Sequence, residues 1–280
     1  MRKSLYLFAF VAVLGVTTLV HARMIAPPTI AQRVAVADLI IVGKVTGFGE
    51  KLIASEMFKG DVGQFQTATL DVSFTPFGTA VKKVVVGYTP TPMAGGGRPI
   101  RRYPTVQLER GQEVALILVK HPSKKDLYIV QHYYDVVPVK INVIDLSEVK
   151  KFSKLLADPK AALASKDASD RFATAAMLVI RHRTSSTGGD KVHPLTTADS
   201  KPILSALAEA DWAVMTTKFP RMSPQLVFSR LGVTDKDGWK QPADFAKFSE
   251  TAQSWLKDNA GKYRIQAFAR PGGKKEEPGS

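Results

Sequence analysis

The stretch Ala37-Asp38-Leu39-Ile40-Ile41-Val42-Gly43-Lys44-Val45-Thr46-Gly47 decides how this chain folds. A short amphipathic run, residues 30–37, leads directly into this apolar, β-branched segment, which ends at glycine. Short runs rich in valine and isoleucine are typical of buried strands, whereas amphipathic spacing is typical of helices. We therefore expect a helical turn that feeds the first strand of a β-domain, and later strands that pair with it.

A series of short β-like runs follows this segment as far as about residue 143. These runs are rich in β-branched and apolar residues, and they are 67–72, 81–88, 113–119, 127–130 and 134–139. Turn residues at 74–78 separate the first two runs, and Pro138 indicates an edge or a break in the last. Several short strands with turn signals between them predict a small barrel or sandwich.

One long insertion, Thr89 to Pro104, interrupts the β-region. It contains four prolines and three consecutive glycines, so we expect a long exposed loop between two strands. Its basic and aromatic residues form the strongest such cluster in the chain, and they are Arg98, Arg101, Arg102 and Tyr103. Arginine binds carboxylate, sulfate or phosphate bidentately, and a tyrosine ring can stack on a sugar or a base. These four residues are the predicted ligand-binding site; the alternative is an ordinary loop.

The spacing of apolar residues becomes helical from Asp145 onward. Asp145 and Glu148 have the spacing of a capping box. Further helices are predicted at 169–183, at 199–210, after Ser223-Pro224 as far as Gly232, and from Pro242 to Gly261.

The sequence thus predicts an α+β protein with two parts. A β-domain covers 23–144, and a helical region covers 145–269 and is packed on the β-domain or beside it. The tail, 270–280, is rich in Pro, Gly, Lys and Glu and is predicted to be disordered.

The segment 1–22 has the pattern of a secretory signal peptide. Arg2 and Lys3 precede an apolar run over 5–20, and Val20-His21-Ala22 provides a cleavage site after Ala22. A retained membrane anchor is the alternative, but the run is shorter than the roughly 20 residues that span a bilayer. We expect a secreted or periplasmic protein that begins near Arg23 and has no transmembrane segment.

The composition limits the possible partners and chemistries. The 280 residues carry a formal net charge of +14, which falls to +12 when Arg2 and Lys3 are removed. A basic balance favours a polyanion such as an acidic glycan, an anionic membrane surface or nucleic acid. The alternative is solubility, which the even spread of the lysines favours. Cysteine is absent, which excludes disulfides, thiol catalysis, zinc–thiolate sites and iron–sulfur clusters.

Motifs of known catalytic or metal-binding chemistry are missing from the sequence. It contains no G-x-S-x-G and no H-E-x-x-H. The best metal candidates, His182 and His193 with Asp190, lack a recognised ligand spacing. The run Asp235-Lys236-Asp237-Gly238 lacks two ligands of a calcium loop and predicts a tight turn instead. We therefore expect a protein that is not an enzyme and has no catalytic residue, no metal site and no cofactor.

Four segments carry a resemblance to a protein family. They are "A-D-L-I-I-V-G-K-V" at 37–45, "D-R-F-A-T-A-A-M-L-V-I-R-H-R-T" at 170–184, "F-S-R-L-G-V-T-D-K-D-G-W" at 228–239 and the ending Trp255–Ile265. In this order they resemble an uncharacterised family of secreted proteins from planctomycete-type bacteria, over essentially the whole mature chain. The resemblance implies no known activity and so assigns no catalytic residue.

The β-half is also weakly similar to the OB-type barrel of tissue inhibitors of metalloproteinases and netrin modules, where a short helix runs into an A-D-type strand. This similarity implies an OB-like β-barrel. Those modules begin with a cysteine that chelates the protease zinc and are held by disulfides, and this chain has neither.

Together these observations predict a secreted, non-catalytic binding or interaction module that recognises an anionic ligand through its basic loop. The expected partner is an anionic glycan or other polyanion, or a secreted protein. The alternative function, suggested only by the barrel resemblance, is an inhibitor-like module that docks on an extracellular enzyme. An enzyme with an unrecognised acid/base site is the third hypothesis.

Overall fold

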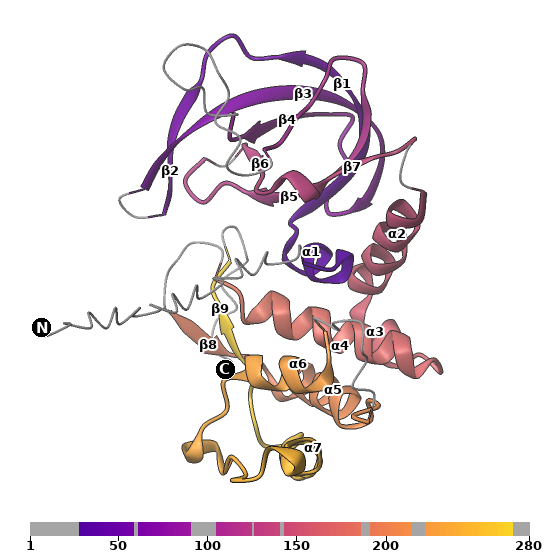
Figure 1. Cartoon of the computed structure of the whole chain (residues 1–280), viewed down its shortest axis with the longest axis vertical. Coiled ribbons are helices and arrows are strands. Elements are labelled where there is room, and N and C mark those ends of the chain that lie inside the picture. The colour runs from indigo at the N-terminus through magenta and orange to yellow at the C-terminus, as the bar shows by residue number, and fades with distance from the viewer. Residues whose placement is uncertain are drawn as a thin grey trace, which may run out of the picture.

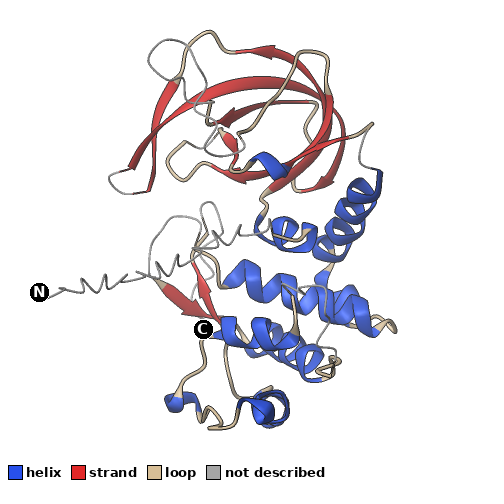
Figure 2. Ribbon diagram, viewed as in Figure 1, coloured by secondary structure: helices blue, strands red, loops and turns tan. Residues whose placement is uncertain are grey.

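The computed structural model of the protein describes residues 28–58, 61–90, 105–124, 126–140, 143–185, 191–213 and 222–270. Over these ranges the protein is a mixed α/β structure with one seven-stranded sheet, one two-stranded sheet and seven α-helices, most of them in the C-terminal half. Figures 1 and 2 show the large sheet at one end of the molecule and the helices at the other, with α1 and α2 next to the sheet. The predicted combination of a β-rich half and a helical half is confirmed.

The predicted helix-to-strand start is confirmed as well. Helix α1 (Ile30–Val36) begins at Thr29, whose hydroxyl accepts a hydrogen bond from the Gln32 backbone N–H at 3.3 Å, while the Gln32 side chain accepts from the Thr29 N–H at 2.9 Å. This capping box satisfies two N–H groups that a helix leaves unpaired. Strand β1 (Leu39–Phe48) follows after two residues, and its first four side chains are buried.

The large sheet connects its strands in a closed circuit of pairings. Its other strands are β2 (Ile53–Phe58), β3 (Asp61–Phe77), β4 (Lys83–Tyr88), β5 (Glu113–Lys120), β6 (Tyr128–Val130) and β7 (Val136–Pro138). Strand β1 pairs antiparallel with both β3 and β5; β3 continues to β4, β4 pairs in parallel with β6, and β6 returns to β5. Strands β2 and β7 attach to β3 and β5 outside this circuit.

The β-half differs from the sequence prediction at 74–78. The predicted turn there is wrong, because β3 continues to Phe77 and the chain turns at Gly78, whose φ is 91°. The register between β1 and β3 shifts between Ile40 and Val42, which pair with Phe77 and Phe74. Proline is tolerated at such an irregularity, so the Pro76 that suggested a turn lies within the strand.

Gly43 lets β1 and β3 approach each other closely at another shift in register. A Cβ atom added to Gly43 would lie 2.5 Å from the carbonyl oxygen of Asp71 in the backbone of β3. Gly47 lies in the same strand without this constraint, since a Cβ atom there would meet only the end of the Arg110 side chain, at 3.9 Å.

We expect Gly43→Ala to lower the free energy of unfolding by about 2 kcal/mol, because overpacking against a backbone that cannot rotate away costs about 1–3 kcal/mol. The matched control, Gly47→Ala, should change it by no more than about 0.5 kcal/mol. Urea unfolding of both variants measures the difference. Equal losses in the two variants would show that the close approach at Gly43 is not the cause.

The described part of the helical half contains six helices in addition to α1. They are α2 (Val143–Ala157), α3 (Pro159–Leu163), α4 (Ala168–His182), α5 (Thr197–Ala208), α6 (Pro224–Leu231) and α7 (Phe248–Asn259). The two-stranded sheet joins β8 (Val192–Pro194) to β9 (Gln266–Phe268). Helix α4 is central, with an unbroken buried run from Thr174 to Ile180. None of the helices in the described ranges is long and apolar enough to cross a membrane.

Most predicted helices occur, with corrections at two starts. Ser223 caps α6 and Gly232, with a φ of 71°, ends it as predicted. Helix α2 begins two residues before Asp145, which therefore lies in its first turn instead of capping it. Helix α7 does not begin at Pro242, because Asp244 caps a 3₁₀ turn, Phe245–Lys247, that runs into α7.

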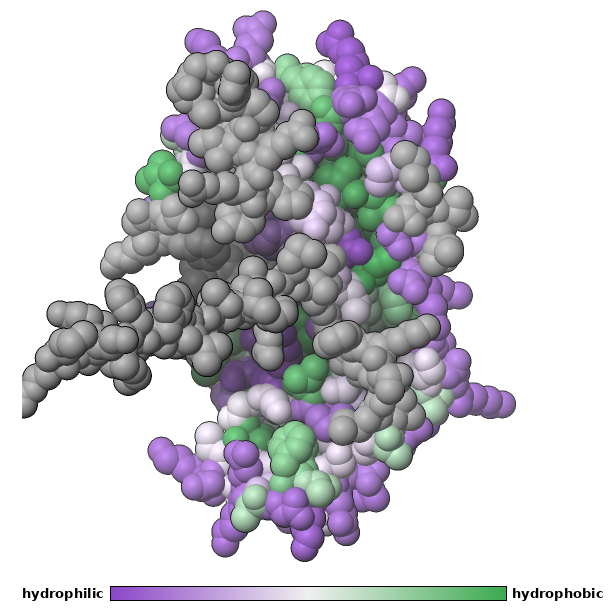
Figure 3. Space-filling view, viewed as in Figure 1, coloured by the Kyte–Doolittle hydropathy of each residue, from purple (hydrophilic) through white to green (hydrophobic). Residues whose placement is uncertain are grey.

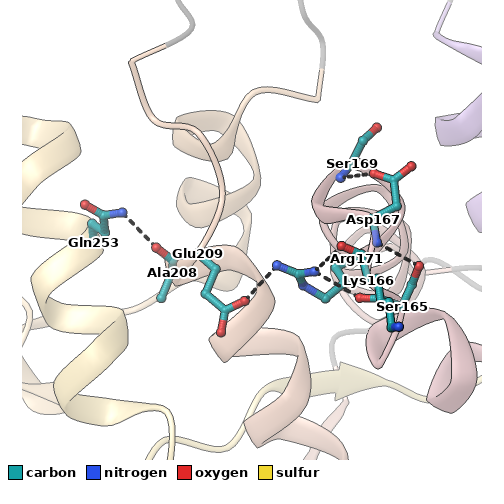
Figure 4. A network of polar contacts seen from close by, with 8 residues as sticks. All are labelled: Ser165, Lys166, Asp167, Ser169, Arg171, Ala208, Glu209 and Gln253. Carbon is teal, nitrogen blue, oxygen red and sulfur yellow. Dashed lines mark hydrogen bonds and ion pairs between the residues drawn. The ribbon is translucent and has the colours of Figure 1, made fainter.

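Polar contacts connect α4, α5 and α7 (Figure 4). Arg171 of α4 donates to the carbonyl oxygens of Ser165 at 2.9 Å and Lys166 at 3.2 Å, and pairs with Glu209 at 3.1 Å. Gln253 of α7 donates to the carbonyl oxygen of Ala208 at 2.8 Å. These contacts hold the C-terminal end of α5 between α4 and α7.

The two halves of the protein meet at α1. Ile30, Val34 and Ala35 of α1 belong to the same buried cluster as the helices of the C-terminal half, and this cluster also contains Ile40 of β1 and Ile117 of β5. A separate buried cluster consists of side chains from the strands of the large sheet and the segment before β5, including Leu70, Val86 and Leu116. Helix α1 therefore provides apolar contact between the sheet and the helices, and so does α2, whose Leu146 packs against Val42, Ala115 and Val137 of the sheet.

Asp38 reinforces this junction with charged contacts. Its carboxylate accepts hydrogen bonds from the Lys120 backbone N–H at 2.9 Å and from the Arg270 guanidinium at 2.7 Å. Arg181 of α4 lies 3.9 Å away and donates to the carbonyl oxygens of Ala35 and Ala37. Arg270, where the sequence predicts a disordered tail to begin, is thus in contact with the junction, and 271–280 lie outside the described residues.

Candidate functional site

A cavity of about 420 Å³ lies between the sheet and the helices. It is bordered by α1, β5, α4, α6 and the 3₁₀ turn η1 (Tyr133–Asp135). Its apolar lining is Pro28, Val36, Ile117, Val119, Ile180 and Leu226. Its polar lining is Gln32, Arg33, Gln131, His132, Tyr134, Asp135, Thr184 and Arg230. A mainly apolar wall with a few convergent polar groups is typical of sites for small molecules.

Arg33 supplies the buried positive charge of this cavity. Only 9% of its surface is exposed, because the last turn of α1 places it against η1. Its Nη1 donates to the carbonyl oxygen of Tyr134, and its guanidinium lies 5.6 Å from the centroid of the Tyr134 ring. Its Nε is buried away from solvent and has no hydrogen-bond partner. Its Nη2 also makes no hydrogen bond within the described part of the chain, but it is not buried in this way.

Asp135 places a buried carboxyl group in the same cavity. It is 6% exposed, and its Oδ2 accepts a hydrogen bond from the His132 backbone N–H at 3.1 Å. Burial raises the pKa of Asp135 from its usual 3.8 to about 7, against the opposing effects of the Arg33 charge and the His132 hydrogen bond. Near neutral pH this carboxyl group is therefore close to half protonated.

His132 and Tyr134 complete the polar wall. Their ring centroids lie 4.8 Å apart, and partial burial lowers the pKa of His132, so this imidazole is neutral at pH 7. The charges on the cavity wall are then those of Arg33, the exposed Arg230 and the partly protonated Asp135. The net charge of the cavity wall is therefore positive, which favours the binding of an anion.

The metal candidates of the sequence do not form a recognisable site. Burial and the nearby positive charges of Arg181 and Arg270 lower the pKa of His182 to about 4, and His193 is close enough to contribute to this shift. Asp190 lies outside the described residues. Among the residues that the structure describes, no three His, Asp or Glu side chains are placed to hold a metal ion.

The predicted ligand-binding residues Arg98, Arg101, Arg102 and Tyr103 lie outside the described residues, so they stay a prediction. The cavity was not predicted from the sequence. Its only signal was the run His132-Tyr133-Tyr134-Asp135, an unusual concentration of polar and aromatic side chains within a β-region. Arg33 gave no signal, because it lies on a short helix whose partner segments come about 100 or more residues later.

Hydrophilic side chains are spread over the described part of the face seen in Figure 3. They lie along its upper, right and lower edges instead of gathering in one patch. The net charge of +14 therefore does not by itself identify a binding surface.

No model of a known protein family matches the chain, and no curated protein is similar to it at a significant level. The resemblances to a planctomycete-type family and to inhibitor barrels remain predictions.

We expect Asp135→Asn to stabilise the protein at pH 8 by about 2–4 kcal/mol, since one pKa unit corresponds to about 1.4 kcal/mol. The pKa of Asp135 is raised on folding, so the folded state binds the extra proton, and the resulting stability is present below about pH 4 and lost as pH rises through 7. Asparagine keeps an acceptor for the His132 N–H without the charge.

Urea unfolding at pH 8 and pH 4.5 measures this effect, with the exposed Asp126→Asn as matched control. The Asp135→Asn gain should shrink strongly at pH 4.5, and the control should change little at either pH. A gain of the same size at both pH values would contradict the raised pKa.

Proposed function

We propose that the protein is a secreted, non-catalytic binding module that holds a small organic anion in the cavity between its sheet and its helices. The observation that carries this proposal is Arg33, a guanidinium that is nine-tenths buried and not fully hydrogen-bonded, on the wall of an open apolar cavity. A buried charge is costly unless it is paired. A bound anion would supply a partner for Nη2, the guanidinium nitrogen of Arg33 that is not sealed from the cavity.

The chemistry of the cavity favours a single carboxylate on an apolar body. One buried cation matches one negative charge, and hydrogen bonds between charged groups are stronger in a site of low dielectric constant. The aliphatic side chains around Arg33 would remove the apolar part of the ligand from water. A highly charged polyanion does not match this lining.

We also infer that the strand circuit is the OB-like barrel that the sequence predicts. Support comes from β1, which pairs with both β3 and β5, and from the parallel pair β4–β6. Numbered along the chain, the five strands of the circuit follow each other in the order 1-2-3-5-4 and return to 1, as in OB-type barrels. Export rests on the pattern of 1–22, which lies outside the described residues.

Removing the Arg33 charge tests the cavity. We expect mature protein, from Arg23 onward, to bind benzoate or octanoate, and Arg33→Met to weaken binding at least tenfold, because a hydrogen bond to a charged group is worth about 1.5–3 kcal/mol. The exposed Arg110→Met is the matched control and should leave the affinity unchanged. Isothermal titration calorimetry measures Kd, and circular dichroism verifies that each variant folds.

Neutral benzamide and cationic benzylamine separate charge recognition from general apolar binding. Both should bind much more weakly than benzoate. If all three bind equally well, or if Arg33→Met binds benzoate as the wild type does, the cavity is not an anion site and the proposed function is wrong.

The basic loop remains a second proposed anion site, for larger ligands. We expect the mature protein to bind a heparin-like glycan. Replacing Arg98, Arg101 and Arg102 by alanine should weaken this binding and reduce its salt dependence, since each ligand charge that the protein neutralises steepens the fall of log affinity with log salt concentration. The matched control replaces three exposed helix lysines, Lys160, Lys201 and Lys257. Equal losses in the two triple variants would show that only the total charge matters.

An acid/base enzyme is the second candidate function. It is favoured by Asp135, because a carboxyl group with a pKa of about 7 suits general acid or base catalysis near neutral pH. Turnover of a bound acid or ester that Asp135→Asn abolishes would favour this candidate over the binding module.

A further inference from the structure

We propose that the cavity takes up its carboxylate ligand together with a proton, and that Asp135 is the group that holds this proton. The inference rests on the proposed function, since it concerns the same cavity. It assigns the ligand class, an apolar monocarboxylic acid, and makes its binding tightest below neutral pH.

The geometry places two groups of opposite charge in the cavity without pairing them. Arg33 and Asp135 both line it, yet no ion pair within 4.0 Å joins them among the contacts of the described residues. The one hydrogen bond described for the Asp135 carboxyl group comes from the His132 backbone N–H. Arg33 directs its own hydrogen bond to the carbonyl oxygen of Tyr134. The Nη2 group of Arg33 is therefore available to a carboxylate other than that of Asp135.

A carboxylate that binds Arg33 brings a second acid into a confined space of low dielectric constant. Two carboxylates that share such a site cannot both stay ionised, and one of them takes a proton. Asp135 is only 6% exposed, and burial already raises its pKa to about 7, so the further proton goes to Asp135. The ligand, held by the guanidinium, stays the anion.

The other charged and titratable groups on the cavity wall do not replace Asp135 in this role. His132, whose pKa burial lowers, precedes η1, and Tyr134 lies within it; from α6 comes the exposed Arg230, which is a cation and not a proton acceptor for this step. Strand β5 contributes Ile117 and Val119, α4 contributes Ile180, and the segment after α4 contributes Thr184; none of these side chains titrates. Asp135 is therefore the proton acceptor among the described groups that line the cavity.

The number of protons taken up when the ligand binds changes with pH. Above pH 7, ionised Asp135 takes one proton from solvent as one ligand anion enters, so Kd rises by as much as tenfold for each pH unit. Below about pH 6, Asp135 is already protonated, so the ligand enters without further proton uptake and Kd is constant. No oxidant, metal or covalent step is needed.

Calorimetry of the mature protein with benzoate measures the proton directly. Titrations at pH 5.5, 6.5, 7.5 and 8.5, each in two buffers of different ionisation enthalpy, give the number of protons taken up per benzoate bound. Benzoate stays ionised across this range, so it contributes no proton of its own. We expect uptake to rise from near zero at pH 5.5 to near one at pH 8.5, with Kd increasing in parallel. Asp135→Asn should bind with a constant Kd and no uptake.

The outcomes separate this inference from the proposed function. Benzoate binding that depends on Arg33 but shows no proton uptake and a constant Kd overturns the inference and leaves the proposed function intact. Undiminished uptake in Asp135→Asn also overturns it, because another group would then hold the proton. If neither benzoate nor octanoate binds, the proposed function fails and this inference with it. The proton count of the wild type needs no variant, so a variant that fails to fold does not prevent the test.

Discussion

The carboxylate of Asp38 is the contact on which the arrangement of this protein depends. It lies between α1 and β1, and it holds the end of β5 through the Lys120 N–H and the C-terminal segment through Arg270. Arg181 of α4 approaches from the helical side and holds the carbonyl oxygens at the end of α1. Removing one partner from such a poorly exposed group of charges leaves the others unpaired, which is more costly than losing an exposed ion pair.

The cavity is a consequence of this junction. Because α1 is fixed at its C-terminal end by Asp38 and packed along one side against α4, its Arg33 side chain faces the η1 turn that follows β6. Arg33 therefore meets Tyr134 and Asp135, residues about 100 positions away in the chain. The site combines one residue from the start of the β-half with a turn from its end, and α4 and α6 close it.

Local sequence signals predicted the helices and strands well, but they predicted poorly which of these elements pack against each other. The apolar run 37–47, the β5 run and the Ser223-Pro224 cap depend on neighbouring residues, so their periodicity and capping were readable. Pro76 was misread because its tolerance depends on a register shift between distant strands. Arg33 and Asp135 were missed for the same reason: burial, and not residue type, gives them their chemistry, and burial here comes from segments far apart in sequence.

The shared core of α1 and α4 also affects the order in which the protein can fold. Helix α1 has seven residues, too few to persist alone in water, and its packing partner α4 begins at Ala168. Contacts between such distant segments carry a high entropic cost of loop closure and slow the folding of a domain. The first helix of the described chain to be synthesised therefore precedes its partner α4 by more than 100 residues, and the wall of the cavity beside it is complete only once α6 has been made.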